Sequence, residues 1–192
     1  LITKLNILPF IATLATMLAA SGTGLLLAGN QSVSVSYDTY FTNLGQGDLL
    51  SFMRPEWVDA DEVGFLGSIL GFILSFPTPA WIAILAYIIG GVVINHTSFG
   101  RHVLAVGGGT EASRLMGLPV NRTIFFVYVI SGALAGLAGV ILASQFGAGQ
   151  PIEGIGWELF AIASVVVGGT LLSGGKGSVA GTLAGALLLG VI

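Results

Sequence analysis

The sequence predicts an all-α membrane protein, a polytopic bundle of transmembrane helices. Two observations of composition lead to this prediction: 54% of the 192 residues are hydrophobic and only 8% are charged. An ordinary soluble domain carries about 25% charged residues, so these few charges cannot cover a water-soluble globule. A third observation is that the apolar runs approach the length of about 20 residues that a helix needs to cross a bilayer.

Five apolar segments are predicted to span the membrane. They are residues 10–29, 79–95, 123–143, 159–173 and 179–192. The fourth segment is the shortest of the first four and is interrupted by glycine. The chain starts at Leu1 without a methionine and stops inside the fifth run. We therefore expect one transmembrane domain over residues 1–192 that is truncated at both ends.

Another apolar run, residues 64–76, is about 13 residues long and is too short for a span. Pro77 and Pro79 follow it and end any helix there. We expect a short interfacial helix within an extracytoplasmic loop formed by residues 30–79.

The charged residues test this topology. Five of the six basic residues fall on one side of the five spans, and only Arg54 falls on the other; the five are Lys4, Arg101, Arg114, Arg122 and Lys176. Lysine and arginine next to spans mark the cytoplasmic side. Eight of the nine acids fall on the opposite side or at its edge: Asp38, Asp48, Glu56, Asp59, Asp61, Glu62, Glu153 and Glu158. A sixth span at residues 64–76 would destroy this sorting.

The cytoplasmic loop, residues 96–122, has its own predicted structure. The glycines at 107–109 are expected to break the chain, and Thr110 is expected to cap a short helix. Glu111 lies in its first turn, where the helix dipole favours a negative charge. Gly117 is suited to the C-cap position and Pro119 prevents continuation. This helix would present Ala112, Leu115 and Met116 on one side, either to a partner's groove or as a mere connector.

Several kinds of chemistry are excluded by pattern. A phosphate loop needs a Ser or Thr after its lysine and a glycine five residues before Gly175, but Gly177 and Thr170 occupy those places. We therefore expect no ATP-binding loop in this chain. His96 and His102 form no metal-binding motif, and the sequence holds no cysteine. No metal site, cofactor, catalytic residue or nucleic-acid partner is predicted.

A route for a hydroxylated solute would need amides, hydroxyls and aromatic rings. Candidates for the substrate path are Asn6, Phe10, Thr13, Gln145 and Gln150, with Thr16 and Ser21 as further polar span residues. The alternative for each polar residue is a hydrogen bond between helices or exposure in a loop.

Four stretches of this sequence resemble a known family. They are residues 9–14, the cytoplasmic residues 99–118, residues 128–139, and residues 158–179 with the run Ser-Gly-Gly-Lys-Gly-Ser. Together these stretches resemble the ribose/xylose/galactose-type permeases of ABC importers, which lie as multi-pass proteins in the bacterial inner membrane.

The resemblance implies a non-enzymatic subunit that translocates a monosaccharide. It implies an ATP-binding subunit that hydrolyses ATP, a second permease subunit, and an extracytoplasmic sugar-binding protein as partners. It also implies that the short cytoplasmic helix couples the permease to the ATPase. The coupling residues would be Gly108, Thr110, Glu111, Ala112, Ser113, Arg114, Leu115, Met116 and Gly117.

Three alternatives stay open from the sequence. A permease of the branched-chain amino-acid type shares the Ser-Gly-Gly-Lys-Gly-Ser run, although the cytoplasmic loop fits the sugar permeases better. A secondary carrier or channel would bring no ATPase with it. An intramembrane enzyme would need an ionisable catalytic group within a span, and none is seen.

Overall fold

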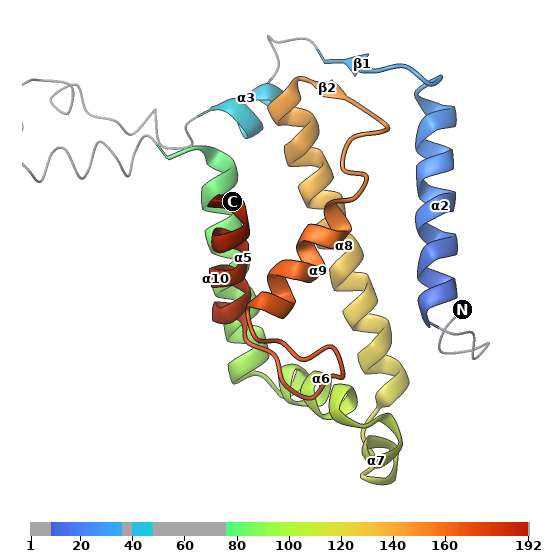
Figure 1. Cartoon of the computed structure of the whole chain (residues 1–192), viewed down its shortest axis with the longest axis vertical. Coiled ribbons are helices and arrows are strands. Elements are labelled where there is room, and N and C mark those ends of the chain that lie inside the picture. The colour runs from blue at the N-terminus through green and yellow to red at the C-terminus, as the bar shows by residue number, and fades with distance from the viewer. Residues whose placement is uncertain (1–8, 36–39, 48–75, 192) are drawn as a thin grey trace, which may run out of the picture.

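The structure is a computed structural model that describes residues 9–35, 40–47 and 76–191. Its elements, labelled as in Figure 1, are α2 (Pro9–Leu27), β1 (Val33–Ser34), α3 (Tyr40–Gln46), α5 (Thr78–His96), α6 (Ser98–Gly108), α7 (Thr110–Leu115), α8 (Val120–Phe146), β2 (Ala148–Gly149), α9 (Trp157–Val167) and α10 (Val179–Val191). The predicted interfacial helix at 64–76 lies outside the described residues, apart from Phe76.

Three long helices form the body of the described chain. α2, α5 and α8 run lengthwise through the molecule, and each is long and apolar enough to cross a membrane. At 1.5 Å per residue, the 27 residues of α8 extend about 40 Å. No residue in the most apolar window of α8 is buried within the chain. The first three predicted spans are therefore confirmed as helices, with their surfaces left free for lipid or further protein.

The fourth predicted span, residues 159–173, is wrong in its second half. Helix α9 has 11 residues and so covers only about 16 Å, half of a bilayer's hydrocarbon core. Its end is a Schellman motif, in which the N–H of Thr170 donates to the carbonyl of Val165 over 3.1 Å. Gly169 has a φ of 85°, which is the left-handed conformation that this motif requires. Apolar residues follow Gly168 and Gly169, so the apolar run in the sequence is longer than the helix. The backbone leaves helical geometry at these two glycines.

Helices α9 and α10 pack against each other at their backbones. A Cβ atom on Gly185 would collide with the carbonyl oxygen of Ser164, and one on Gly168 would collide with the carbonyl of Gly181. Only glycine allows such a close approach, as is common between membrane helices. By contrast, a Cβ on Gly132, Gly136 or Gly139 of α8 would meet nothing within 4 Å.

The end of the bundle that contains α3 and β1 (Figure 1) is held by polar contacts. The buried hydroxyl of Ser144, at the end of α8, donates to the carbonyl of Phe41 in α3. The Gln46 amide Nε2 donates to the carbonyl of Gln145 over 2.8 Å. Strand β1 pairs with β2 in antiparallel register. Helix α3 was not predicted, because it is short and depends on these tertiary bonds.

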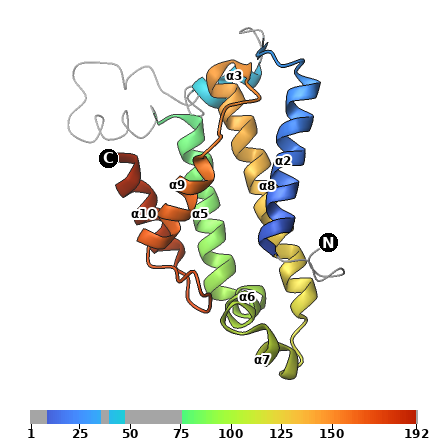
Figure 2. The ribbon, with the colours of Figure 1, turned by 45° about the vertical axis from the view of Figure 1, so that its right-hand side comes forward.

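The opposite end of the bundle contains α6, α7 and the turn between α9 and α10 (Figures 1 and 2). Helix α6 was not predicted, since the glycines at 107–109 were expected to break the chain. The helix in fact continues through Gly107 and Gly108, and only Gly109 interrupts it. Thr97 caps its start, accepting a hydrogen bond from the N–H of Gly100 over 3.2 Å.

A matched pair of substitutions in α10 tests the α9–α10 contact. We expect Gly185→Ala to destabilise the protein by about 1–3 kcal/mol, because the new methyl group forces the two backbones apart. Gly190→Ala is the control, since its Cβ meets nothing within 4 Å, and it should be neutral or slightly stabilising. Thermal unfolding of the purified protein in detergent measures both. Equal melting temperatures for the two variants would contradict this packing.

Candidate functional site

The N-cap residue of α7 is Gly109, which has no side chain that could cap the helix. The predicted cap residue Thr110 is instead the first helical residue, and no side chain caps this end. Gly109 occupies the cap position with extended backbone, and its carbonyl accepts from the N–H of Ser113 over 3.0 Å. The prediction that Thr110 caps the helix was therefore wrong, because the glycine before it takes that place.

The other end of α7 is as predicted. Gly117 has a φ of 76°, and its N–H donates to the carbonyl of Arg114 over 2.9 Å. The N–H of Leu118 donates to the carbonyl of Ser113 over 3.0 Å. These two bonds make a Schellman motif, which fixes the direction in which the chain leaves toward α8.

α7 is exposed at every residue except Ser113. Ser113 is fully buried, and its hydroxyl has no hydrogen-bond partner. Leu115 is 89% exposed and Met116 is 67% exposed. Glu111 and Arg114 approach to 3.9 Å on the same exposed surface. Such a solvent-screened pair contributes little stability, so this surface offers two apolar side chains with charges beside them.

Basic residues gather at this end of the molecule. Arg101 lies in α6, Arg114 in α7, and Arg122 at the start of α8. Lys176 belongs to the turn between α9 and α10, whose Gly174 and Gly175 contact α6. This agrees with the side that the charge pattern predicts to be cytoplasmic. Lys4 and Arg54 are outside the described residues.

A cavity of about 710 Å³ lies between α2 and the first half of α8. Four hydroxyl groups line it, from Thr13, Thr16, Tyr128 and Ser131, together with the ring of Phe125. Thr13 donates to the carbonyl of Phe10 over 3.0 Å, and Thr16 donates to that of Ala12 over 2.8 Å. Each threonine oxygen therefore keeps lone pairs that can accept a hydrogen bond from a solute.

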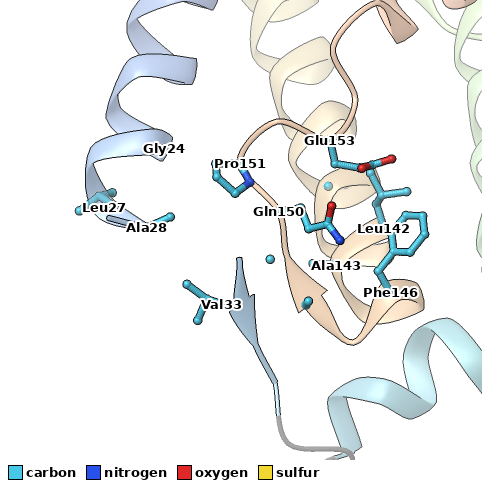
Figure 3. A pocket seen from close by; sticks show the side chains of 13 residues that line it. Gly24, Leu27, Ala28, Val33, Leu142, Ala143, Phe146, Gln150, Pro151 and Glu153 are labelled. Atoms are coloured by element: carbon cyan, nitrogen blue, oxygen red, sulfur yellow. The ribbon is translucent and has the colours of Figure 1, made fainter. Parts of the chain in front are cut away.

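A second cavity, of about 440 Å³, lies between the other ends of the same two helices (Figure 3). Gln150 and Glu153 reach it from the loop after β2, beside Phe146 and Leu142 of α8. Leu27, the last residue of α2, and Ala28 after it form the opposite wall. The two cavities thus follow the α2–α8 boundary from one end of the helices toward the other.

The predicted substrate-path residues are distributed unevenly. Thr13 lines the first cavity and Gln150 the second. Phe10 is 71% exposed and lines neither cavity. Gln145 lines neither as well, and Asn6 is outside the described residues.

Tyr128 and Ser131 were not among the substrate-path residues predicted from the sequence. Their spacing of three residues places them on one face of α8, and this was the available signal. Within the described part of the chain, no cluster of His, Asp and Glu side chains could hold a metal ion.

Comparison with known proteins relates the whole chain to membrane transport proteins. The L-arabinose transport system permease protein AraH of Escherichia coli K12 is 36% identical over 191 residues, which is 100% of this chain and 51% of that protein. The ribose import permease protein RbsC of the same strain is 38% identical over 192 residues, with 100% and 53% covered. The fructose import permease protein FruG of Bifidobacterium longum is 35% identical over 192 residues, with 100% and 52% covered.

The chain therefore spans about half the length of the curated relatives it matches. No solved structure matches it. A family described as "Branched-chain amino acid transport system / permease component" matches residues 1–192. With three membrane-length helices and a match over its full length, the chain belongs to this permease family.

Proposed function

We propose that the chain is part of the membrane-spanning permease subunit of an ATP-driven importer that carries a monosaccharide across the bacterial inner membrane. The observation that supports this most strongly is α7. It is a short helix in the segment that joins the long helices α5 and α8, at the basic end of the molecule, with Leu115 and Met116 exposed. Such side chains on an aqueous face fit the groove of a partner protein.

An ATP-binding subunit is the partner that this helix fits best. In this proposal ATP is hydrolysed by a separate subunit on the cytoplasmic side, and the positive charges near α7 support placing α7 on that side. Motion of the motor would reach the membrane helices through α7, with Leu115 and Met116 seated in the partner and Glu111 and Arg114 at the rim. A second permease subunit and an extracytoplasmic sugar-binding protein would complete a multi-pass importer.

A sugar suits the first cavity better than an amino acid does. An amino acid carries both an ammonium and a carboxylate, and burying them requires charged or strongly polar partners. None of the described residues that line the cavity between α2 and α8 is charged, and their polar groups are hydroxyls. Hydroxyls beside aromatic rings suit a neutral solute with many hydroxyl groups. The names of the relatives, which transport arabinose, ribose and fructose, support the same choice.

The docking of α7 can be tested with Met116→Glu in the full-length permease. We expect the yield of co-purified ATP-binding subunit to fall about tenfold, equivalent to about 1.4 kcal/mol, because a charge enters an apolar contact. Ile152→Glu is the control, since Ile152 is also exposed, at 64%, but lies in the loop after β2. Equal recovery of the ATPase with both variants would contradict the assignment of α7, and a wild-type permease that recovers no ATPase would contradict the importer.

The solute route can be tested with Thr16→Val. Losing one hydrogen bond of about 1 kcal/mol should raise the KM for sugar uptake roughly fivefold. Thr23→Val is the matched control: its hydroxyl also donates to a carbonyl four residues earlier, over 2.9 Å, but Thr23 lines neither cavity. Uptake of labelled pentoses and hexoses into proteoliposomes measures both. An unchanged KM for Thr16→Val would contradict the proposal that this cavity is part of the solute route.

A further inference from the structure

The end of α6 touches the turn between α9 and α10 through glycine backbones. A Cβ atom on Gly174 would collide with the carbonyl of Gly107, and one on Gly175 would approach the Cα of Gly108 to 3.2 Å. In the other direction, a Cβ on Gly107 would come within 3.3 Å of the nitrogen of Gly175. Two main chains therefore lie in direct contact, with no side chain between them to absorb a displacement.

The turn is stiffened on its own side of this contact. The N–H of Leu171 donates to the carbonyl of Lys176 over 3.2 Å, and the N–H of Gly174 donates to the carbonyl of Leu171 over 3.0 Å. The helices that it joins are locked by the glycine contacts at Gly168 and Gly185. Helices α9, α10 and their turn thus form one closely packed block.

The other side of the contact is joined to α7 by continuous hydrogen bonds. The N–H of Gly109 donates to the carbonyl of Ala105 in α6 over 3.2 Å. The carbonyl of Gly109 accepts from the N–H of Ser113 in α7 over 3.0 Å. The break between α6 and α7 is therefore one residue wide, so a push on α7 displaces the end of α6 as well.

We propose that the Gly107–Gly108 and Gly174–Gly175 contact is a mechanical joint that passes the movement of α7 to the α9–α10 block. In this proposal these glycines are positioning residues, because they act through their contact with each other and not on the solute. The two main chains already touch, so a displacement of one toward the other is passed on, because atoms in van der Waals contact are hardly compressible. The joint rests on the proposed function, in which α7 receives its movement from an ATP-binding subunit.

Two glycines of the same turn region provide a matched test. Gly174 and Gly169 both have a φ of 85°, so alanine costs a similar backbone strain at each. Only at position 174 would the methyl group strike another main chain, whereas position 169 has nothing within 4 Å. Both variants are placed in the full-length permease and reconstituted with its ATP-binding subunit and its sugar-binding protein. Sugar uptake, ATP hydrolysis and recovery of the ATPase are measured on each.

The joint predicts a specific loss in Gly174→Ala. We expect the ATP-binding subunit to co-purify equally with both variants. Gly174→Ala should transport about tenfold less sugar per ATP hydrolysed than Gly169→Ala. This ratio corresponds to about 1.4 kcal/mol of coupling free energy. Equal sugar-to-ATP ratios would overturn the joint. So would loss of ATPase recovery in Gly174→Ala alone, because the contact would then support docking. If the wild-type complex recovers no ATPase, the proposed function itself fails.

A cross-link keeps the joint testable if Gly174→Ala does not fold. The chain has no native cysteine, so the pair Gly108→Cys and Gly175→Cys can be oxidised without competing thiols in this chain. A Cβ on Gly108 would lie 3.4 Å from the Cα of Gly175, which is within reach of a disulfide. In this proposal the two sides move together, so a disulfide between them should not impede transport. The oxidised transporter should therefore have the same sugar-to-ATP ratio as the same variant after reduction. Loss on oxidation that reduction restores would show that the contact must open, and would overturn the joint.

Discussion

Every part of this structure depends on one constraint: a backbone N–H or carbonyl inside hydrocarbon must find its partner within the protein. Uninterrupted helices satisfy it in α2, α5 and α8, whose residues need nothing from solvent. At the end of α9, where the chain leaves helical geometry, a Schellman motif provides hydrogen bonds in place of water. The glycines at this place allow the left-handed backbone and the close contacts that the replacement requires.

The two ends of the bundle meet this constraint in different ways. At one end, side-chain hydrogen bonds such as that from Ser144 to Phe41 tie α3 to α8. At the other end, α6 meets the turn before α10 through glycine backbones. Polar bonds at the first end join α3 to α8 and β1 to β2, while the second end leaves Leu115 and Met116 exposed. In the proposed importer, the solute enters at the end where α3 is bonded to α8. The ATP-binding subunit acts at the opposite end, where α6 contacts the turn before α10.

The sequence predicted what depends on length and composition, and missed what depends on single residues. The first three spans follow from apolar runs with few charges. α9 ends early because Gly168 and Gly169 turn the chain, although apolar residues follow. α6 was missed because its glycines lie inside the helix, held by the backbone of Gly174 rather than by their own propensity. In the candidate site, Gly117 is identifiable from sequence, while Tyr128 and Ser131 depend on the rotation of α8, which no local pattern determines.

The central claim is that lipid surrounds the long helices and that α7 faces the cytoplasm. Single cysteines test it directly in the full-length protein once any cysteine outside this chain is replaced by serine; this chain has none of its own. Leu115→Cys and Ile152→Cys would place a thiol at positions 89% and 64% exposed, at α7 and in the loop after β2. A membrane-impermeant maleimide added to intact cells should label position 152 and leave position 115 unlabelled until the membrane is inverted. Labelling of position 115 from outside intact cells would contradict the orientation and the transport mechanism together.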